Sequence, residues 1–261
     1  ERLNMKKWYF IYSGHLPPAL NMAIDETLLD ILSASTTPLL RIYGWNPHSF
    51  SLGYSQNPES VLYMDKCRED NIPFVKRATG GGIIFHGDEV TYSIACTEED
   101  IDSPISVKDA YKRICSFLME TYIRFGLKPF FAIDGPESKK IKSSFCFSSF
   151  EDYDILLEGK KIGGNAQKRK KKMIMQHGSI PLSLNIPLVS RYVKEPILPA
   201  ERRATSMKEI LGRKISFEEF AGVMKESFIS VFNAELEELK FSEEQRILIE
   251  KNLTVVKNRT I

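Results

Sequence analysis

Residues 76–86 read KRATGGGIIFH, and this stretch sets the interpretation of the whole chain. Three successive glycines at positions 80–82 let the backbone approach a ligand closely and turn its N–H groups toward an oxyanion or a carbonyl. Arg77 stands before the glycines and His86 follows them. The stretch lacks the Gly-Lys-Ser/Thr of a Walker A loop and the GxGxxG of a dinucleotide-binding turn. By itself it predicts either a ligand-binding loop or a bulged connection between strands.

A second polar and glycine-rich stretch lies further along the chain. Residues 158–167 read EGKKIGGNAQ, and residues 176–180 read QHGSI. Two short strands turning at Glu158-Gly159 fit the flanking apolar residues. The sequence therefore predicts two tight, glycine-lined connections within sheet regions.

Hydrophobic periodicity predicts the elements around these stretches. Alternating residues at 7–12 predict a strand, and a 3.6-residue apolar period after Pro18 predicts a helix. The same reasoning gives helices at 59–70 and 107–125, and strands at 39–43, 50–54, 90–96, 153–157, 160–162 and 173–182. From about residue 199 onward the pattern is helical. We expect a mixed α/β fold, with a main domain at 1–195 and a helical C-terminal extension at 196–261 packed on it.

Composition excludes several classes of protein. The 261 residues are 43% hydrophobic, enough for one sizeable core, and no run of 18 apolar residues occurs. The first residues do not resemble a signal peptide, so we expect a cytoplasmic protein without membrane contact. A block of five cations at 168–172 indicates a solvated loop or a docking surface for an acidic protein. Nucleic-acid binding is disfavoured, because no aromatic residues are interleaved with the cations.

Four cysteines occur, and none of them forms a CxxC pair. This spacing argues against a zinc site and against a disulfide framework, so no metal is expected. Cys67, Cys96 and Cys115 fall in predicted helices or strands and are expected to fill the core. Each cysteine is then either a core residue or a nucleophile, and for Cys146 both alternatives stay open at this point. Cys146 is a candidate nucleophile, or an ordinary thiol in a loop or the core.

Taken in order, these segments resemble the lipoate-protein ligase and octanoyltransferase superfamily, which shares its core fold with the biotin protein ligases. The resemblance spans roughly residues 21–182 and implies a mixed β-sheet core with packed helices. The segments that carry it are Asn21-Met-Ala-Ile-Asp-Glu26, the Arg-Ala-Thr-Gly-Gly-Gly run with His86, Gly-Lys-Lys-Ile-Gly-Gly-Asn-Ala-Gln at 159–167, and His177-Gly178-Ser179.

Two features favour the cysteine-dependent branch of this superfamily. Ligases of this kind usually continue past the histidine with Asp-x-Gly-Asn, whereas His86 is followed here by Gly-Asp-Glu-Val-Thr. Lipoate-ligase-like octanoyltransferases carry their nucleophile in a Cys-Phe pair, and this chain has Cys146-Phe147 in the matching place. The resemblance implies that Cys146 forms a thioester. It also implies that Lys161 activates that thiol, orients the acyl carbonyl and shuttles a proton.

The resemblance also implies which residues contact the acyl group, through backbone N–H groups near its carbonyl. His86 is either a structural histidine beneath the glycine turn or a residue that shapes the pocket, and His177 is expected to be structural. The implied substrate-binding residues are Arg77, Thr79, Gly80, Gly81, Gly82, His86, Gly163, Gly164 and Ala166.

The implied reaction is octanoyl transfer in lipoate biosynthesis. The donor is octanoyl on the phosphopantetheine of acyl carrier protein, and the acceptor is a lysine of the glycine cleavage H protein or of an E2 lipoyl domain. No cofactor is expected, and the protein is expected to be a monomer. Two departures from the transferase pattern, Ser148-Ser149-Phe150 and the third glycine Gly82, keep an ATP- and magnesium-dependent lipoate-protein ligase as an alternative. A non-catalytic acyl- or lipoyl-binding module is the other.

Overall fold

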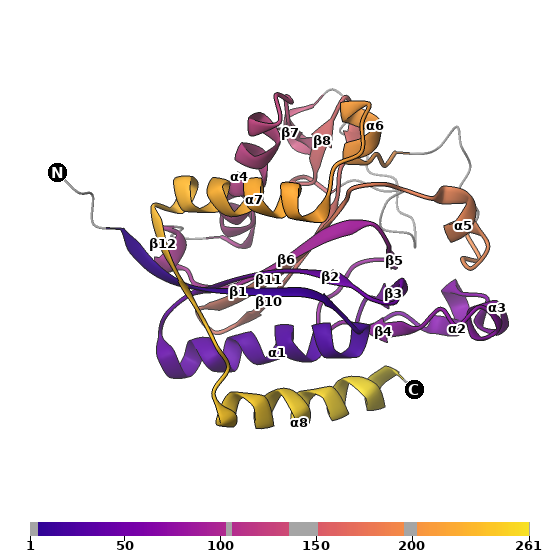
Figure 1. Cartoon of the computed structure of the whole chain (residues 1–261), viewed down its shortest axis with the longest axis horizontal. Coiled ribbons are helices and arrows are strands. Elements are labelled where there is room, and N and C mark those ends of the chain that lie inside the picture. The colour runs from indigo at the N-terminus through magenta and orange to yellow at the C-terminus, as the bar shows by residue number, and fades with distance from the viewer. Residues whose placement is uncertain (1–4, 103–105, 136–150, 196–202, 261) are drawn as a thin grey trace.

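A computed structural model describes residues 5–102, 106–135, 151–195 and 203–260, and a six-stranded mixed sheet forms its centre (Figure 1). The strand order is β10-β11-β6-β2-β1-β12. β1 runs parallel to both of its neighbours, and the other pairs are antiparallel. The bounds are β1 Lys6–Leu16, β2 Leu39–Trp45, β6 Glu89–Thr97, β10 Gly164–Lys170, β11 Met173–Pro181 and β12 Ala234–Glu238.

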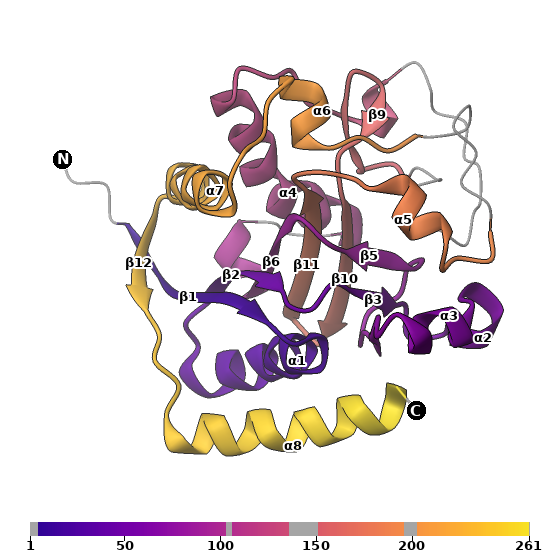
Figure 2. The same ribbon diagram turned by 45° about the vertical axis from the view of Figure 1, so that its right-hand side comes forward.

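Helices cover both faces of this sheet (Figures 1 and 2). α1 (Pro18–Ser35) lies on one face, with α8 (Glu243–Thr260) packed on its outer side, and α4 (Val107–Arg124) and α7 (Phe217–Phe232) lie on the other face. Successive side chains of a strand point to opposite faces, so the side chains of β2 pack against the helices on both faces of the sheet. Leu39 and Tyr43 pack with α1, whereas Leu40 and Ile42 pack with α4 and α7.

Two three-stranded sheets flank the central one and carry the glycine-rich stretches. The first has the order β4-β3-β5, and the second has the order β7-β8-β9. Short helices connect these strands. The bounds are β3 Ser49–Leu52, β4 Phe74–Lys76, β5 Ile84–His86, β7 Phe130–Phe131, β8 Ile155–Leu157, β9 Lys160–Lys161, α2 Pro58–Val61, α3 Met64–Glu69, α5 Ile186–Ser190, α6 Met207–Leu211, and the 3-10 helices η1 Glu99–Ile101 and η2 Ala132–Asp134.

The mixed α/β fold predicted from the sequence is confirmed, but the single helix predicted at 59–70 is wrong. It is divided into α2 and α3 at Leu62, whose backbone is extended (φ −118°, ψ 147°). Leu62 is fully buried and forms an isolated bridge with Val193. A long-range pairing thus overrides a local helical pattern, as tertiary context commonly does.

The C-terminal part of the chain contributes to every layer of the molecule. α7 packs on α4, β12 joins the edge of the sheet beside β1, and α8 packs on α1. One strand, β12, therefore lies within the portion whose sequence pattern is helical. The division of the chain at residue 195 remains a prediction.

Candidate active site

One pocket brings together residues from distant parts of the chain at the beginning of α1. The glycine segment forms one side of the pocket, and the facing ends of β10 and β11 form the other. Met22, Trp45 and Ile84 supply an apolar wall. Of the residues expected to bind substrate, Arg77, Gly80, Gly81, His86, Gly164 and Ala166 line it.

The glycine segment takes a conformation that its glycines make possible. Gly81 has φ +97°, a region that L side chains rarely adopt. A Cβ atom at Gly53 would lie 2.1 Å from the Gly81 carbonyl oxygen, so two backbone segments touch there. Two backbone segments also touch at Gly163, in the second glycine-rich stretch. A Cβ atom there would lie 2.6 Å from the Ser179 carbonyl oxygen. These glycines allow the segments around the pocket to pack closely.

Arg77 holds this loop closed on itself. Its Nη2 donates to the carbonyl oxygens of Gly80 (3.0 Å) and Gly82 (2.9 Å). Its Nη1 donates to the Ser51 backbone carbonyl and to Ser51 Oγ, both at 2.8 Å. Arg77 is 3% exposed, so these bonds form inside the protein and are strengthened by the charge. Arg77 thus clamps the glycine loop through these bonds, and Gly82 is one of the residues that it binds.

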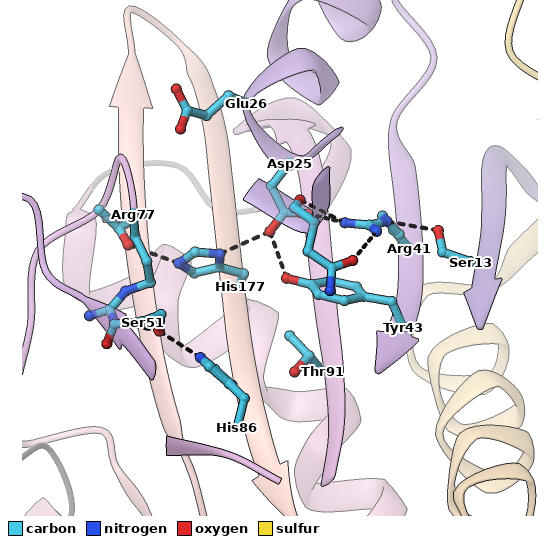
Figure 3. A network of polar contacts seen from close by, with 12 residues as sticks. Ser13, Asp25, Glu26, Arg41, Tyr43, Ser51, Arg77, His86, Thr91 and His177 are labelled. Atoms are coloured by element: carbon cyan, nitrogen blue, oxygen red, sulfur yellow. Dashed lines mark hydrogen bonds and ion pairs between the residues drawn. The ribbon is translucent and has the colours of Figure 1, made fainter. Parts of the chain in front are cut away.

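His86 connects the hydrogen bonds of Arg77, through Ser51, to the buried carboxylate of Glu89. Its Nε2 lies 2.5 Å from Ser51 Oγ (Figure 3). Its Nδ1 lies 2.7 Å from Glu89 Oε1. The ring stacks on Trp45, with centroids 3.7 Å apart. Burial lowers the pKa of His86 and outweighs the opposing effect of Glu89, which favours a neutral ring. With Nδ1–H donating to Glu89, Nε2 accepts from the Ser51 hydroxyl, which in turn accepts from Arg77.

A second histidine holds the loop from the side of α1. His177 Nε2 lies 2.8 Å from Thr79 Oγ1, and His177 Nδ1 lies 3.0 Å from Asp25 Oδ2 (Figure 3). Thr79 therefore lies beside the pocket as a partner of His177, which itself lines the pocket. Thr79 is thus bonded directly to His177, whereas Arg77 is linked to His86 through Ser51, and each histidine bonds a carboxylate.

Asp25, which bonds His177, belongs to a buried polar network that the sequence pattern did not predict. Its Oδ1 accepts from Arg41 Nη1 at 2.7 Å, and its Oδ2 accepts from the Tyr43 hydroxyl at 2.8 Å (Figure 3). Burial alone would raise the pKa of Asp25, but the hydrogen bond with His177 and the charge of Arg41 lower it. Arg41 also donates from Nη2 to Asn21 Oδ1 at 2.7 Å. Both Asn21 and Asp25 belong to the polar positions of the Asn21–Glu26 segment, and their spacing of four residues was the available signal.

Lys161 does not line the pocket, and it is buried in an ion pair. Its Nζ lies 2.7 Å from Asp154 Oδ2, and the two residues are 3% and 2% exposed. The backbone of Lys161 is fixed on one side by β8 and on the other by hydrogen bonds with Arg203 and Thr205. Gly164, which lines the pocket, follows Lys161 by three positions in the chain. Lysines are almost never fully buried unless paired, and Asp154 supplies the partner here. Asp154 was not predicted from the sequence.

The described cysteines occupy the core. Cys67, Cys96 and Cys115 are all buried and free. Burial raises the pKa of Cys96, and it raises the pKa of Cys115 to about 12. A thiol with such a pKa is protonated at neutral pH and is a poor nucleophile. Cys146, the predicted nucleophile, lies outside the described residues.

The described part of the chain contains neither a metal-binding cluster nor a membrane-spanning helix. No group of three or more His, Cys, Asp or Glu side chains within it could hold a metal ion. No helix within it is long and apolar enough to cross a membrane.

Comparisons with known proteins identify relatives along most of the chain. The profile described as the lipoyl protein ligase A/B catalytic domain matches residues 17–229. A protein of Geobacillus kaustophilus named octanoyltransferase LipM is 35% identical over 258 residues, covering 94% of this chain and 93% of that protein. The octanoyltransferase LipM of Bacillus subtilis is 34% identical over 260 residues, covering 93% of this chain and 92% of that protein.

Solved structures share the fold at lower identity. A lipoate-protein ligase A bound with ATP has a TM-score of 0.78 at 17% identity, covering 95% of this chain and 94% of that chain. A bipartite lipoate protein ligase from Thermoplasma acidophilum, studied with its E2 lipoyl domain, has a TM-score of 0.77 at 16% identity, covering 95% of this chain and 92% of that chain.

Proposed function

This chain belongs to the family of lipoyl protein ligase A/B catalytic domains, and on that premise we propose that it transfers octanoyl groups in lipoate biosynthesis. The observation that carries this proposal is the match to octanoyltransferases along more than nine-tenths of both chains. The pocket supports it, because a glycine loop clamped by Arg77 faces a strand that leads back to the buried Lys161. The enzyme is then an acyltransferase.

The first half of the reaction loads the enzyme. The thiolate of Cys146 attacks the carbonyl carbon of an octanoyl thioester, a C–S bond to the enzyme forms, and the C–S bond to the donor breaks. The donor thiol leaves and takes up a proton. Only the thiolate attacks well, and a nearby ammonium stabilises it. We assign this role to Lys161, whose position is fixed by Asp154.

The second half discharges the enzyme onto a lysine. The acceptor lysine first loses one proton to solvent, and its neutral amine then attacks the thioester, so that a C–N bond forms and the C–S bond to Cys146 breaks. We propose that Lys161 gives a proton of its ammonium to the leaving Cys146 sulfur and takes up the proton that the amine loses. The thioester keeps the acyl group activated throughout, so no ATP is consumed and no cofactor is needed.

The octanoyl chain is proposed to bind in the pocket lined by Met22, Trp45 and Ile84, whose volume of about 30 Å³ must widen to admit it. Burying its methylenes at about 0.8 kcal/mol each favours binding by roughly 5 kcal/mol before association costs. Backbone N–H groups of the glycine segment and of residues 163–166 are proposed to hold the carbonyl end. The depth of the pocket then selects the length of the chain.

The proposed partners follow from this chemistry. The donor is octanoyl on the phosphopantetheine arm of acyl carrier protein, and the acceptor is an apo E2 lipoyl domain or the glycine cleavage H protein. The T. acidophilum ligase of the same fold was studied with its E2 lipoyl domain, which supports a lipoyl-domain acceptor.

A lipoate-protein ligase is the second candidate. The full run of Gly80, Gly81 and Gly82 favours it, as does the fold shared with a ligase bound with ATP. Against it, Glu89 stands where ligases of this kind usually have glycine followed by asparagine. Its buried carboxylate would repel a triphosphate.

The proposal is tested by trapping the loaded enzyme. Incubation with octanoyl-acyl carrier protein, without nucleotide, is expected to add one octanoyl mass to the enzyme. Peptide mapping should place it on Cys146, and hydroxylamine should remove it. A wild-type enzyme that stays unmodified under these conditions, yet modifies an acceptor when given octanoate and ATP, is a ligase.

We also predict that the hairpin lysines dock the acidic carrier. Lys168, Lys170 and Lys171 are exposed where β10 turns into β11. At ~3.3 Å per residue, Lys170 lies roughly 20 Å along β10 from Gly164 in the pocket, a span that the flexible arm of a carrier must bridge. Replacing these three lysines with glutamine is expected to raise the KM for the carrier several-fold and to flatten its dependence on salt.

The matched control replaces Lys240, Lys251 and Lys257 with glutamine, which changes the net charge equally at exposed positions around α8. This control should leave the KM close to the wild-type value. If the hairpin variant has an unchanged KM at low salt, the hairpin is only a solvated turn.

A further inference from the structure

A second cavity of about 180 Å³ lies behind the wall that carries His86. It opens between the turn that joins β5 to β6 and the helix α5, which lie at the same end of the molecule in both views (Figures 1 and 2). Its walls are mostly apolar, and they include Phe85, Pro181, Leu184, Ile186, Leu188 and Val189.

The cavity shares walls with both sides of the proposed reaction centre. Glu89 lines it, and the same carboxylate binds His86, which lines the acyl pocket. Ala204 lines it as well, and Ala204 forms a bridge with Lys161. That bridge is held by hydrogen bonds from the Lys161 N–H to the Arg203 carbonyl (2.7 Å) and from the Thr205 N–H to the Lys161 carbonyl (2.9 Å). The cavity thus borders a residue bonded to the acyl pocket, Glu89, and a residue paired with Lys161, Ala204.

The titratable residues of its lining are His48, Asp88 and Glu89, and the two carboxylates favour a cation. Glu89 is 4% exposed, and within the described residues both hydrogen bonds to its carboxylate, from His86 and from Thr91, fall on Oε1. Asp88 adds a second carboxylate at the exposed rim, where its Oδ2 accepts from Ser183 Oγ at 2.7 Å. A buried carboxylate oxygen attracts a positive charge and repels a phosphate.

We propose that this second cavity receives the side chain of the acceptor lysine. The inference rests on the octanoyl transfer proposed above, and it names the site that the second substrate occupies. The four methylenes of lysine lie against the apolar walls, and the nitrogen is directed by Glu89 toward the reaction centre beside Lys161. A lysine combines a long apolar stem with a cationic tip, and that combination matches this lining.

The charge of the cavity also separates the two substrates. Donor and acceptor are used one after the other, so each must reach the same thioester. A phosphopantetheine arm carries a phosphate, which the carboxylates of Asp88 and Glu89 disfavour. The acceptor lysine carries the opposite charge. The cavity therefore acts in discharging the enzyme and not in loading it.

The two half-reactions test this inference separately. Leu188→Trp places bulk in the cavity, and Asp88→Asn removes charge from its rim while leaving Glu89 and His86 in place. Loading is followed as octanoyl-enzyme formed from octanoyl-acyl carrier protein. Discharge is followed after adding an apo lipoyl domain to the isolated octanoyl-enzyme.

Both variants are expected to load within about twofold of the wild-type rate. Leu188→Trp should discharge at least tenfold more slowly, and Asp88→Asn should raise the KM for the apo lipoyl domain several-fold. Hydroxylamine, which is small and uncharged, should discharge both variants as fast as the wild type. Ile247→Trp adds the same bulk at an exposed position on α8 and should change neither half-reaction.

The inference is overturned if Leu188→Trp slows loading as much as discharge, because the cavity would then serve the donor. It is also overturned if Asp88→Asn and Leu188→Trp both discharge at the wild-type rate. Failure of the wild-type enzyme to load at all contradicts the proposed function instead.

Discussion

Replacing Cys146 with alanine is expected to reduce octanoyl transfer on the order of 10³-fold or more, because both halves of the reaction run through its thioester. The expectation rests on the Cys146-Phe147 pair and its place ahead of the Lys161 segment. The measurement is the rate at which an apo lipoyl domain gains an octanoyl group, with folding of the variant checked by circular dichroism.

The other cysteines provide matched controls. Cys67, Cys96 and Cys115 are buried, and burial raises the pKa of each thiol. Replacing any one of them with alanine removes a small core group, so stability falls modestly while activity per folded molecule is retained. Full activity in a folded Cys146→Ala enzyme would mean that the acyl group never resides on this residue.

Replacing Lys161 with alanine is expected to have the second-largest effect, a loss on the order of 10²-fold or more in kcat. Lys161 and the preceding Lys160 offer a direct comparison, since Lys160 is exposed and Lys161 is buried against Asp154. Lys160→Ala should leave kcat and KM close to their wild-type values. The measurement is steady-state transfer together with the rate at which octanoyl-enzyme forms.

The ion pair makes Lys161→Ala destabilising as well as inactivating. Removing one partner of a buried pair leaves the other charge uncompensated, which costs about 3–5 kcal/mol. Adding Asp154→Asn removes that charge, so the double variant should recover much of its thermal stability but none of its activity. A double variant with wild-type kcat would assign Lys161 a purely structural role.

The parts of the site that the sequence predicted are those with a local signature. Gly80, Gly81, His86 and the Gly164–Ala166 segment line one pocket, and each belongs to a short stretch that can be recognised in the sequence. Asp25 was missed because its helix was read from its apolar residues alone. Asn21 and Asp25 lie on the same buried face, at 0% and 1% exposure, and two buried polar residues one turn apart indicate a polar network.

The parts of the fold that the sequence did not predict depend on pairing between distant segments. β12 reads AELEE, a helix-favouring composition, yet its backbone pairs in parallel with β1 at the edge of the sheet. β10 carries the cationic block and reads as a loop, but its backbone pairs with β11 along seven residues. In both strands few side chains are buried, so the hydrophobic pattern that identifies strands is weak.

The central claim, transfer through a thioester without nucleotide, is tested most directly by comparing two mixtures. One contains the enzyme, an apo lipoyl domain and octanoyl-acyl carrier protein. The other contains the enzyme, the same domain, free octanoate, ATP and magnesium. The acceptor is weighed by mass spectrometry in each. The account predicts octanoylation in the first mixture alone, and modification in the second mixture alone would contradict it and identify the chain as a ligase.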